Sequence, residues 1–141
     1  MSEHDITTRP GQPIPVGEPF DPSTQVVGLE KSTGDAHFMA WTDAGPPRID
    51  GYTVSAPMIL QDPPHAGEMH PDGDELLYVV SGRFHVTLEL DAEHRELELR
   101  HGEALIVPRG VWHLVEAQEP GQLVHITPGP GGDHRPLPAA P

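Results

Sequence analysis

Apolar and polar residues alternate along much of the chain, which is the period of a half-buried β-strand. The clearest stretch is 83–90, where every second residue from Phe84 to Leu90 is apolar. The stretch 94–101 repeats the pattern with glutamates on its polar face. No stretch shows the 3.6-residue period of an amphipathic helix. The pattern therefore predicts an all-β protein.

Short apolar runs separated by turn residues predict the individual strands. The predicted strands cover residues 24–30, 37–41, 51–60, 65–70, 75–81, 83–90, 94–101, 103–108, 111–117 and 121–127. The Gly45-Pro46-Pro47 segment indicates that 43–50 is a loop. Strands this short and this evenly spaced favour a closed barrel or a double-sheet jelly roll.

Proline is concentrated at the two ends of the chain and sets the expected domain boundaries. Residues 1–23 contain five prolines, so we expect an extended or disordered arm that joins neither helix nor sheet. Residues 128–141 are rich in proline and glycine, and we expect a tail of the same kind. We expect Asp133, His134 and Arg135 in that tail to be solvated, with a lid over the barrel as the alternative. Residues 24–127 then form a single barrel domain.

The composition excludes several classes of protein. The chain carries 22 acidic residues against eight lysines and arginines, for a formal charge of −14, which repels nucleic acids and anionic membranes. Cysteine does not occur, so disulfides, thiolate metal sites and cysteine nucleophiles are ruled out. No apolar run reaches the roughly 20 residues of a membrane span. The first residues lack the basic and apolar regions of a signal peptide, and we expect a cytoplasmic protein.

Two groups of residues carry the chemistry of the chain. The first reads Glu68-x-His70-x4-Glu75-x6-Gly82, and the second reads Gly102-x5-Pro108-x-Gly110-x2-His113. Together they supply two imidazoles and two carboxylates, the ligand set that divalent first-row metals take in catalytic sites. Glycine and proline stand where strands must turn.

Strand alternation indicates which of these side chains can meet. Glu68 and His70 lie two residues apart, so they share a face of their strand. A four-residue turn then returns the chain to Glu75, and the second group presents His113. A shared divalent cation, neutralised by the two carboxylates, would offset the cost of burying these side chains. Of the four ligand roles, that of Glu68 is the least constrained, and the alternative is that Glu68 faces solvent on its strand.

The two groups resemble the paired motifs of the cupin superfamily, which are small β-barrels that hold one metal ion in the barrel mouth. His70, Glu75, Gly82, Gly102, Pro108, Gly110 and His113 stand at motif positions. Glu68 replaces the first histidine of the usual motif, and Ala117 replaces its asparagine. The resemblance implies a single cupin β-barrel, or double-stranded β-helix, with His70, Glu75, His113 and Glu68 as ligands of one divalent ion. It does not select a reaction, because a shared fold hosts many functions.

Several expectations follow for function. Hard carboxylate ligands favour Fe, Mn, Zn or Ni over Cu(I). The apolar interior favours a small organic substrate with an apolar or aromatic portion. An oxygenase-type or isomerase- or cyclase-type enzyme is one hypothesis; a non-catalytic small-molecule- or metal-binding module and a structural domain are the others. His125 is a candidate general base and His65 a reserve ligand that needs a bulge to reach the site. We also expect a homodimer, formed through strand 52–60 and Tyr78.

Overall fold

Strands account for all regular secondary structure in the part of the chain that the computed structural model describes, residues 17–42 and 45–139. They are β1 (Val26–Glu30), β2 (Ala36–Met39), β3 (Gly51–Ser55), β4 (Met58–Ile59), β5 (Gly67–Met69), β6 (Glu75–Val79), β7 (Arg83–Leu90), β8 (Glu93–Arg100), β9 (Ala104–Val107), β10 (His113–Glu119), β11 (Gly121–Gly129) and β12 (Asp133–Arg135). The all-β prediction is confirmed. These residues also include no helix that is long and apolar enough to span a membrane.

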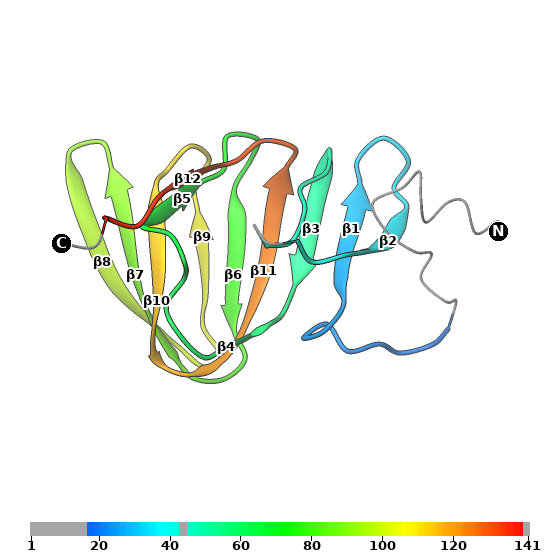
Figure 1. The fold of residues 1–141 in the computed structure, drawn as a ribbon, viewed down its shortest axis with the longest axis horizontal. Coiled ribbons are helices and arrows are strands. Elements are labelled where there is room, and N and C mark those ends of the chain that lie inside the picture. Colours follow the sequence, from blue (N-terminus) through cyan, green and yellow to red (C-terminus); the bar gives the residue numbers. More distant parts are fainter. Residues whose placement is uncertain (1–16, 43–44, 140–141) are drawn as a thin grey trace.

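The strands form two antiparallel sheets (Figure 1). One sheet has the order β2-β1-β3-β11-β6-β9, with the short β4 paired to β11. The other has the order β12-β5-β10-β7-β8. Each sheet joins strands from distant parts of the sequence, such as β11 with β3 and β10 with β5, beside hairpin pairs such as β1 with β2 and β7 with β8. This arrangement of two sheets confirms the predicted jelly roll.

The hydrophobic core lies between the two sheets, as the alternation predicts. On β7, Phe84, Val86 and Leu88 are buried, and they pack against residues of the facing sheet such as Leu77 and Leu123. Full burial of side chains of this size stabilises a fold by roughly 1.5–3 kcal/mol each. The core therefore fixes the two sheets against each other.

The predicted strand 51–60 is divided in the structure. β3 ends at Ser55, and β4 begins only at Met58. Pro57 lies between them and has no backbone N–H to donate to a neighbouring strand. Its carbonyl still accepts a hydrogen bond from the N–H of Leu123, at 3.2 Å. The proline therefore interrupts the strand without releasing the segment from the sheet.

The expectation that the C-terminal tail joins no sheet is wrong for residues 128–129, which end β11, and for residues 133–135. Residues 133–135 form β12, which pairs with β5 and places His134 opposite Glu68 (red and green in Figure 1). Without β12, β5 would expose a row of unpaired backbone groups at the sheet edge. Asp133 and His134 remain exposed, but Arg135 is half-buried and forms an ion pair with Glu89. Its guanidinium also lies over the ring of Trp112, with 4.1 Å between the guanidinium carbon and the ring centroid.

The N-terminal arm lies mostly outside the described residues, as do residues 140–141 at the other end. Within the described part, Phe20 packs edge-on against Phe38 with 5.2 Å between ring centroids. The division of the chain into arm, barrel and tail stays a prediction, and β12 shows that part of the tail pairs with the barrel sheet.

Exposed apolar side chains gather on the outer face of the larger sheet. Leu29, Tyr52, Tyr78 and Ile106, from four strands of that sheet, are each exposed to at least two fifths. Two of them, Tyr52 and Tyr78, lie on the segments expected to form the dimer surface. The homodimer stays a prediction that light scattering tests, and a monomer mass would contradict it.

Replacing Arg135 with alanine should lower the free energy of unfolding by about 0.5–1 kcal/mol, because the variant loses a cation–π contact and a partly exposed ion pair. The matched control is Arg95→Ala, which removes an exposed pair with Glu93 and should change stability by less. Urea denaturation of both variants measures the difference. Equal stability of the two variants would mean that β12 is not fastened through Arg135.

Candidate metal centre

The two halves of the sequence motif are joined by backbone hydrogen bonds. The N–H of Gly110 donates to the carbonyl of His70 at 2.9 Å, and the N–H of Arg109 donates to the Asp74 carboxylate at 2.8 Å. Gly110 has a φ of +75°, a conformation that side-chain-bearing residues rarely adopt, so glycine suits this turn. The turn sets the start of β10, and thereby His113, beside the first half of the motif.

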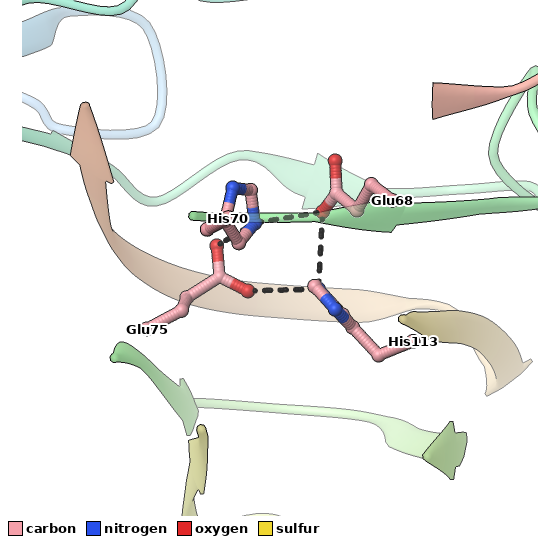
Figure 2. A group of neighbouring side chains, drawn as sticks. All are labelled: Glu68, His70, Glu75 and His113. Carbon is pink, nitrogen blue, oxygen red and sulfur yellow. Dashed lines mark hydrogen bonds and ion pairs between the residues drawn. The ribbon is translucent and has the colours of Figure 1, made fainter. Parts of the chain in front are cut away.

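Four predicted side chains meet at this end of the sandwich. Glu68 lies on β5, His70 just beyond that strand, Glu75 at the start of β6 and His113 at the start of β10. Figure 2 shows that acids and imidazoles alternate around a closed ring. From His70 Nε2 the nearest carboxylate oxygens are 3.3 Å away in Glu75 and 3.7 Å in Glu68; from His113 Nε2 they are 3.1 and 3.4 Å. The fold therefore brings together the four residues that the motif spacing predicted to meet.

Burial and pairing shift the pKa values of the ring. His70, Glu75 and His113 are buried, and only Glu68 retains partial exposure. Burial alone lowers the pKa of His113, but the hydrogen bonds that His113 donates to the carboxylates of Glu68 and Glu75 outweigh it and raise this pKa to about 10. The pKa of His70 is raised by the same balance. Burial raises the carboxyl pKa values, but the two imidazoles outweigh it and hold the pKa of both Glu68 and Glu75 below the usual range.

The donor atoms of the ring fit a divalent cation. The four ligand atoms lie within 4.8 Å of one another, which suits a shared ion with bonds of about 2.0–2.2 Å. Among the described residues, His70 Nδ1 is buried without a hydrogen-bond partner, while Nε2 faces the carboxylates of Glu75 and Glu68. His113 Nδ1 lies 3.1 Å from the carbonyl of Val111, to which it donates, so the neutral ring presents the Nε2 lone pair to the cluster.

Glu75 is oriented by a residue that the sequence did not single out for this role. The Thr127 hydroxyl donates to Glu75 Oε2 at 2.6 Å, and both side chains are buried. Thr127 lies on β11, two residues beyond His125 on the same face of the strand. That shared parity is the signal in the sequence that links the threonine to the site.

A second group of possible ligands borders the ring on the side of Glu68. His65 Nε2 and His134 Nε2 lie 3.8 and 3.5 Å from Glu68 Oε2. However, His65 Nδ1 accepts a hydrogen bond from the Gly67 N–H at 3.1 Å, so the neutral ring carries its proton on Nε2. His65 is therefore a hydrogen-bond donor in this arrangement rather than a ligand. His134, expected to be solvated, is half-exposed and borders the site through β12.

A large cavity adjoins the ring. Its volume is about 1120 Å³, and its lining includes Glu68, Thr127 and His125 beside apolar residues of both sheets. His125 Nδ1 donates to the carbonyl of Leu123 at 3.2 Å, which leaves the Nε2 lone pair of the neutral ring available. The arrangement can hold a cation at the ring and an organic molecule in the cavity beside it.

Part of the chain matches a known protein family. The family described as "Cupin domain" matches residues 60–129, a stretch that contains all four side chains of the ring. Comparison with curated proteins found no match.

Several solved structures are similar in fold. One is hydroxypropylphosphonic acid epoxidase from S. wedmorenis in complex with fosfomycin, 21% identical over 54% of this chain and 43% of that chain, with a TM-score of 0.43. Another is hydroquinone 1,2-dioxygenase in complex with Cd²⁺ and 4-hydroxybenzonitrile, 21% identical over 55% and 58%, with a TM-score of 0.46. A mutant of oxalate decarboxylase from Bacillus subtilis is 22% identical over 61% and 24%, with a TM-score of 0.49. The chain spans less than two thirds of each of these proteins, and the likeness concerns the fold alone.

The raised imidazole pKa values predict that a metal ion binds with release of protons. An imidazole must be neutral to ligate, and at neutral pH the metal-free ring holds His113, with its pKa of about 10, in the charged form. Affinity for Zn²⁺ should therefore increase as the pH rises from about 6.5 toward 10, by about tenfold per pH unit for each proton displaced. Calorimetry in buffers of different ionisation enthalpy measures the protons released.

The stability of the metal-free protein should show the opposite trend. Because the folded pKa of His113 exceeds its unfolded value, its ion pairs stabilise the fold fully below a pH of about 6.5, and this contribution is lost as the pH rises toward 10. For the predicted proton release, the contradicting result is zinc binding at neutral pH with no proton released, because His113 would then not be charged in the metal-free ring.

Proposed function

We propose that this chain, in which residues 60–129 match the cupin domain family, is a metal-dependent enzyme that acts on a small organic molecule. The observation that carries the proposal is the buried ring of two imidazoles and two carboxylates beside a cavity large enough for a substrate. Pockets for small molecules have volumes of this order and are lined mostly by apolar groups with a few convergent polar ones.

In this proposal one divalent ion is held by His70, Glu75 and His113, with Glu68 as the fourth ligand. His113 and Glu75 are pre-oriented for this role by Val111 and Thr127. Two imidazoles with hard carboxylate oxygens suit Fe, Mn, Zn or Ni. When bound, a redox-active ion would supply oxygen chemistry, and Zn or Mn would supply Lewis-acid chemistry at a carbonyl.

His125 is the proposed acid–base residue. It lines the cavity next to the ring, on the strand face that also carries Thr127, and its Nε2 lone pair is available to accept a proton from a substrate C–H or O–H. A base at this position favours an enzyme over a non-catalytic binding module. Such a proton transfer is compatible with an isomerase- or cyclase-type reaction and with an oxygenase-type reaction on a substrate that must be deprotonated.

Metal binding should depend on the two ring histidines. His70→Ala and His113→Ala each remove a ligand and leave the neighbouring carboxylates facing each other, so each should weaken zinc binding at least about 100-fold. The control is His85→Ala, because His85 lies on β7 and pairs with Glu96 away from the ring. Calorimetry and metal analysis measure affinity and stoichiometry. A full equivalent of zinc in the His70→Ala, His113→Ala double variant would place the site elsewhere.

Catalysis should depend on His125 without metal loss. Fe²⁺-loaded protein is screened for oxygen consumption, and Zn²⁺- or Mn²⁺-loaded protein for isomer or cyclised products, with one library of small organic molecules. For any substrate found, His125→Gln should lower kcat by about 10²–10⁴-fold, because a positioned base contributes that much, while the metal content stays at one ion per chain. Unchanged turnover in the variant would remove His125 from the mechanism. Saturable binding with no turnover in any metal form would favour the binding module.

A further inference from the structure

Arg48 is a half-buried cation in the wall of the cavity. It lies in the loop before β3, and its side chain contributes to the same cavity as Glu68 and His125. Its one hydrogen bond among the described residues runs from Nη1 to the carbonyl of Pro46, at 3.2 Å. A guanidinium has five N–H donors, so most of its donors remain available.

Arg48 differs from the arginines on the strands. The four arginines on β7, β8 and β12 all pair with glutamates: Arg83 with Glu98 and Glu119, Arg95 with Glu93, Arg100 with Glu98 and Arg135 with Glu89. Among the described residues, no carboxylate lies within ion-pair distance of Arg48. In a chain with 22 acidic residues and eight lysines and arginines, an unpaired cation that borders a cavity is unexpected.

The loop that carries Arg48 is anchored. The hydroxyl of the buried Thr53 donates to the carbonyl of Pro47 at 2.9 Å, next to Arg48 in the chain. The backbone next to Arg48 is thus tied to β3 of the larger sheet, while Glu68 borders the cavity from β5 of the other sheet. A molecule in the cavity can therefore contact Arg48 and the metal-binding ring from opposite sheets.

We propose that Arg48 binds a carboxylate group of the substrate, which makes the substrate class small organic acids with an apolar body. A planar guanidinium matches a carboxylate through two parallel hydrogen bonds. An anionic ligand would also offset the cost of leaving this cation half-buried and unpaired. This inference rests on the proposed function, since it names the substrate class of the same site.

The other residues of the cavity are consistent with such a ligand. Trp41, Met58 and Leu60 line it with exposed apolar side chains that an apolar body would cover.

Two acids also border the cavity. Asp62 already accepts a hydrogen bond from the Ala117 N–H at 3.3 Å, and Glu68 is neutralised in the ring. Arg135 also borders it, but Glu89 and Trp112 already engage its guanidinium.

The test compares acids with amides of the same shape. Benzoate and hexanoate, with benzamide and hexanamide as their neutral partners, are titrated into the Zn²⁺-loaded protein by calorimetry. The acids should bind at least about tenfold more tightly than the amides, since a hydrogen-bonded charge pair contributes more than a neutral contact. Arg48→Gln should remove this preference with zinc content unchanged, Arg48→Lys should retain part of it, and the surface control Arg95→Gln should match the original chain.

The outcomes separate this inference from the proposed function. If zinc binds and Arg48→Gln retains the full preference for acids, Arg48 is not the anchor and the metal proposal stands. The same holds if neither acid binds more tightly than its amide. If the protein takes up no metal, the titrations are repeated on the metal-free chain. An Arg48-dependent preference there would support the anchor while the metal proposal fails, and no such preference would overturn both.

Discussion

The structure depends on the pairing of four charges that are largely removed from water. Glu75 and His113 are almost fully buried, and each would be costly alone. The alternating ring gives every carboxylate two imidazole neighbours and every imidazole two carboxylates. Its net charge is zero when both imidazoles are protonated. In the proposed metal-bound state, the same four side chains would hold a divalent ion once those protons leave.

Strand register explains why the ring forms at this place. Glu68 lies on β5 between two neighbours, and both pairings set a histidine opposite it: His113 on β10 and His134 on β12. The C-terminal strand is therefore part of the surroundings of the site and not an appendage. The turn at Gly110, bonded to the carbonyl of His70, keeps the two motif halves together. Below the ring, the apolar core fixes the distance between the sheets.

Alternation and spacing predicted the parts of the structure that depend on local periodicity. The period of two along 83–90 identified Phe84, Val86 and Leu88 as core residues, and motif spacing identified the four side chains that now lie together. Three features depend on contacts between distant segments and have no periodic signal. β12 is three residues long and pairs because β5 offers an edge. Arg48 sits in a loop, and the ring nitrogen of His65 that carries its proton is set by the Gly67 N–H.

We propose that one divalent ion binds inside the ring of Glu68, His70, Glu75 and His113. Anomalous scattering from crystals grown with zinc tests it most directly, because the difference map locates the ion without reference to activity. We expect one peak per chain at about 2.0–2.2 Å from Nε2 of His70, Nε2 of His113 and a carboxylate oxygen of Glu75. A peak between His65 and His134 with none inside the ring, or zinc-replete crystals with no peak at either place, would contradict it.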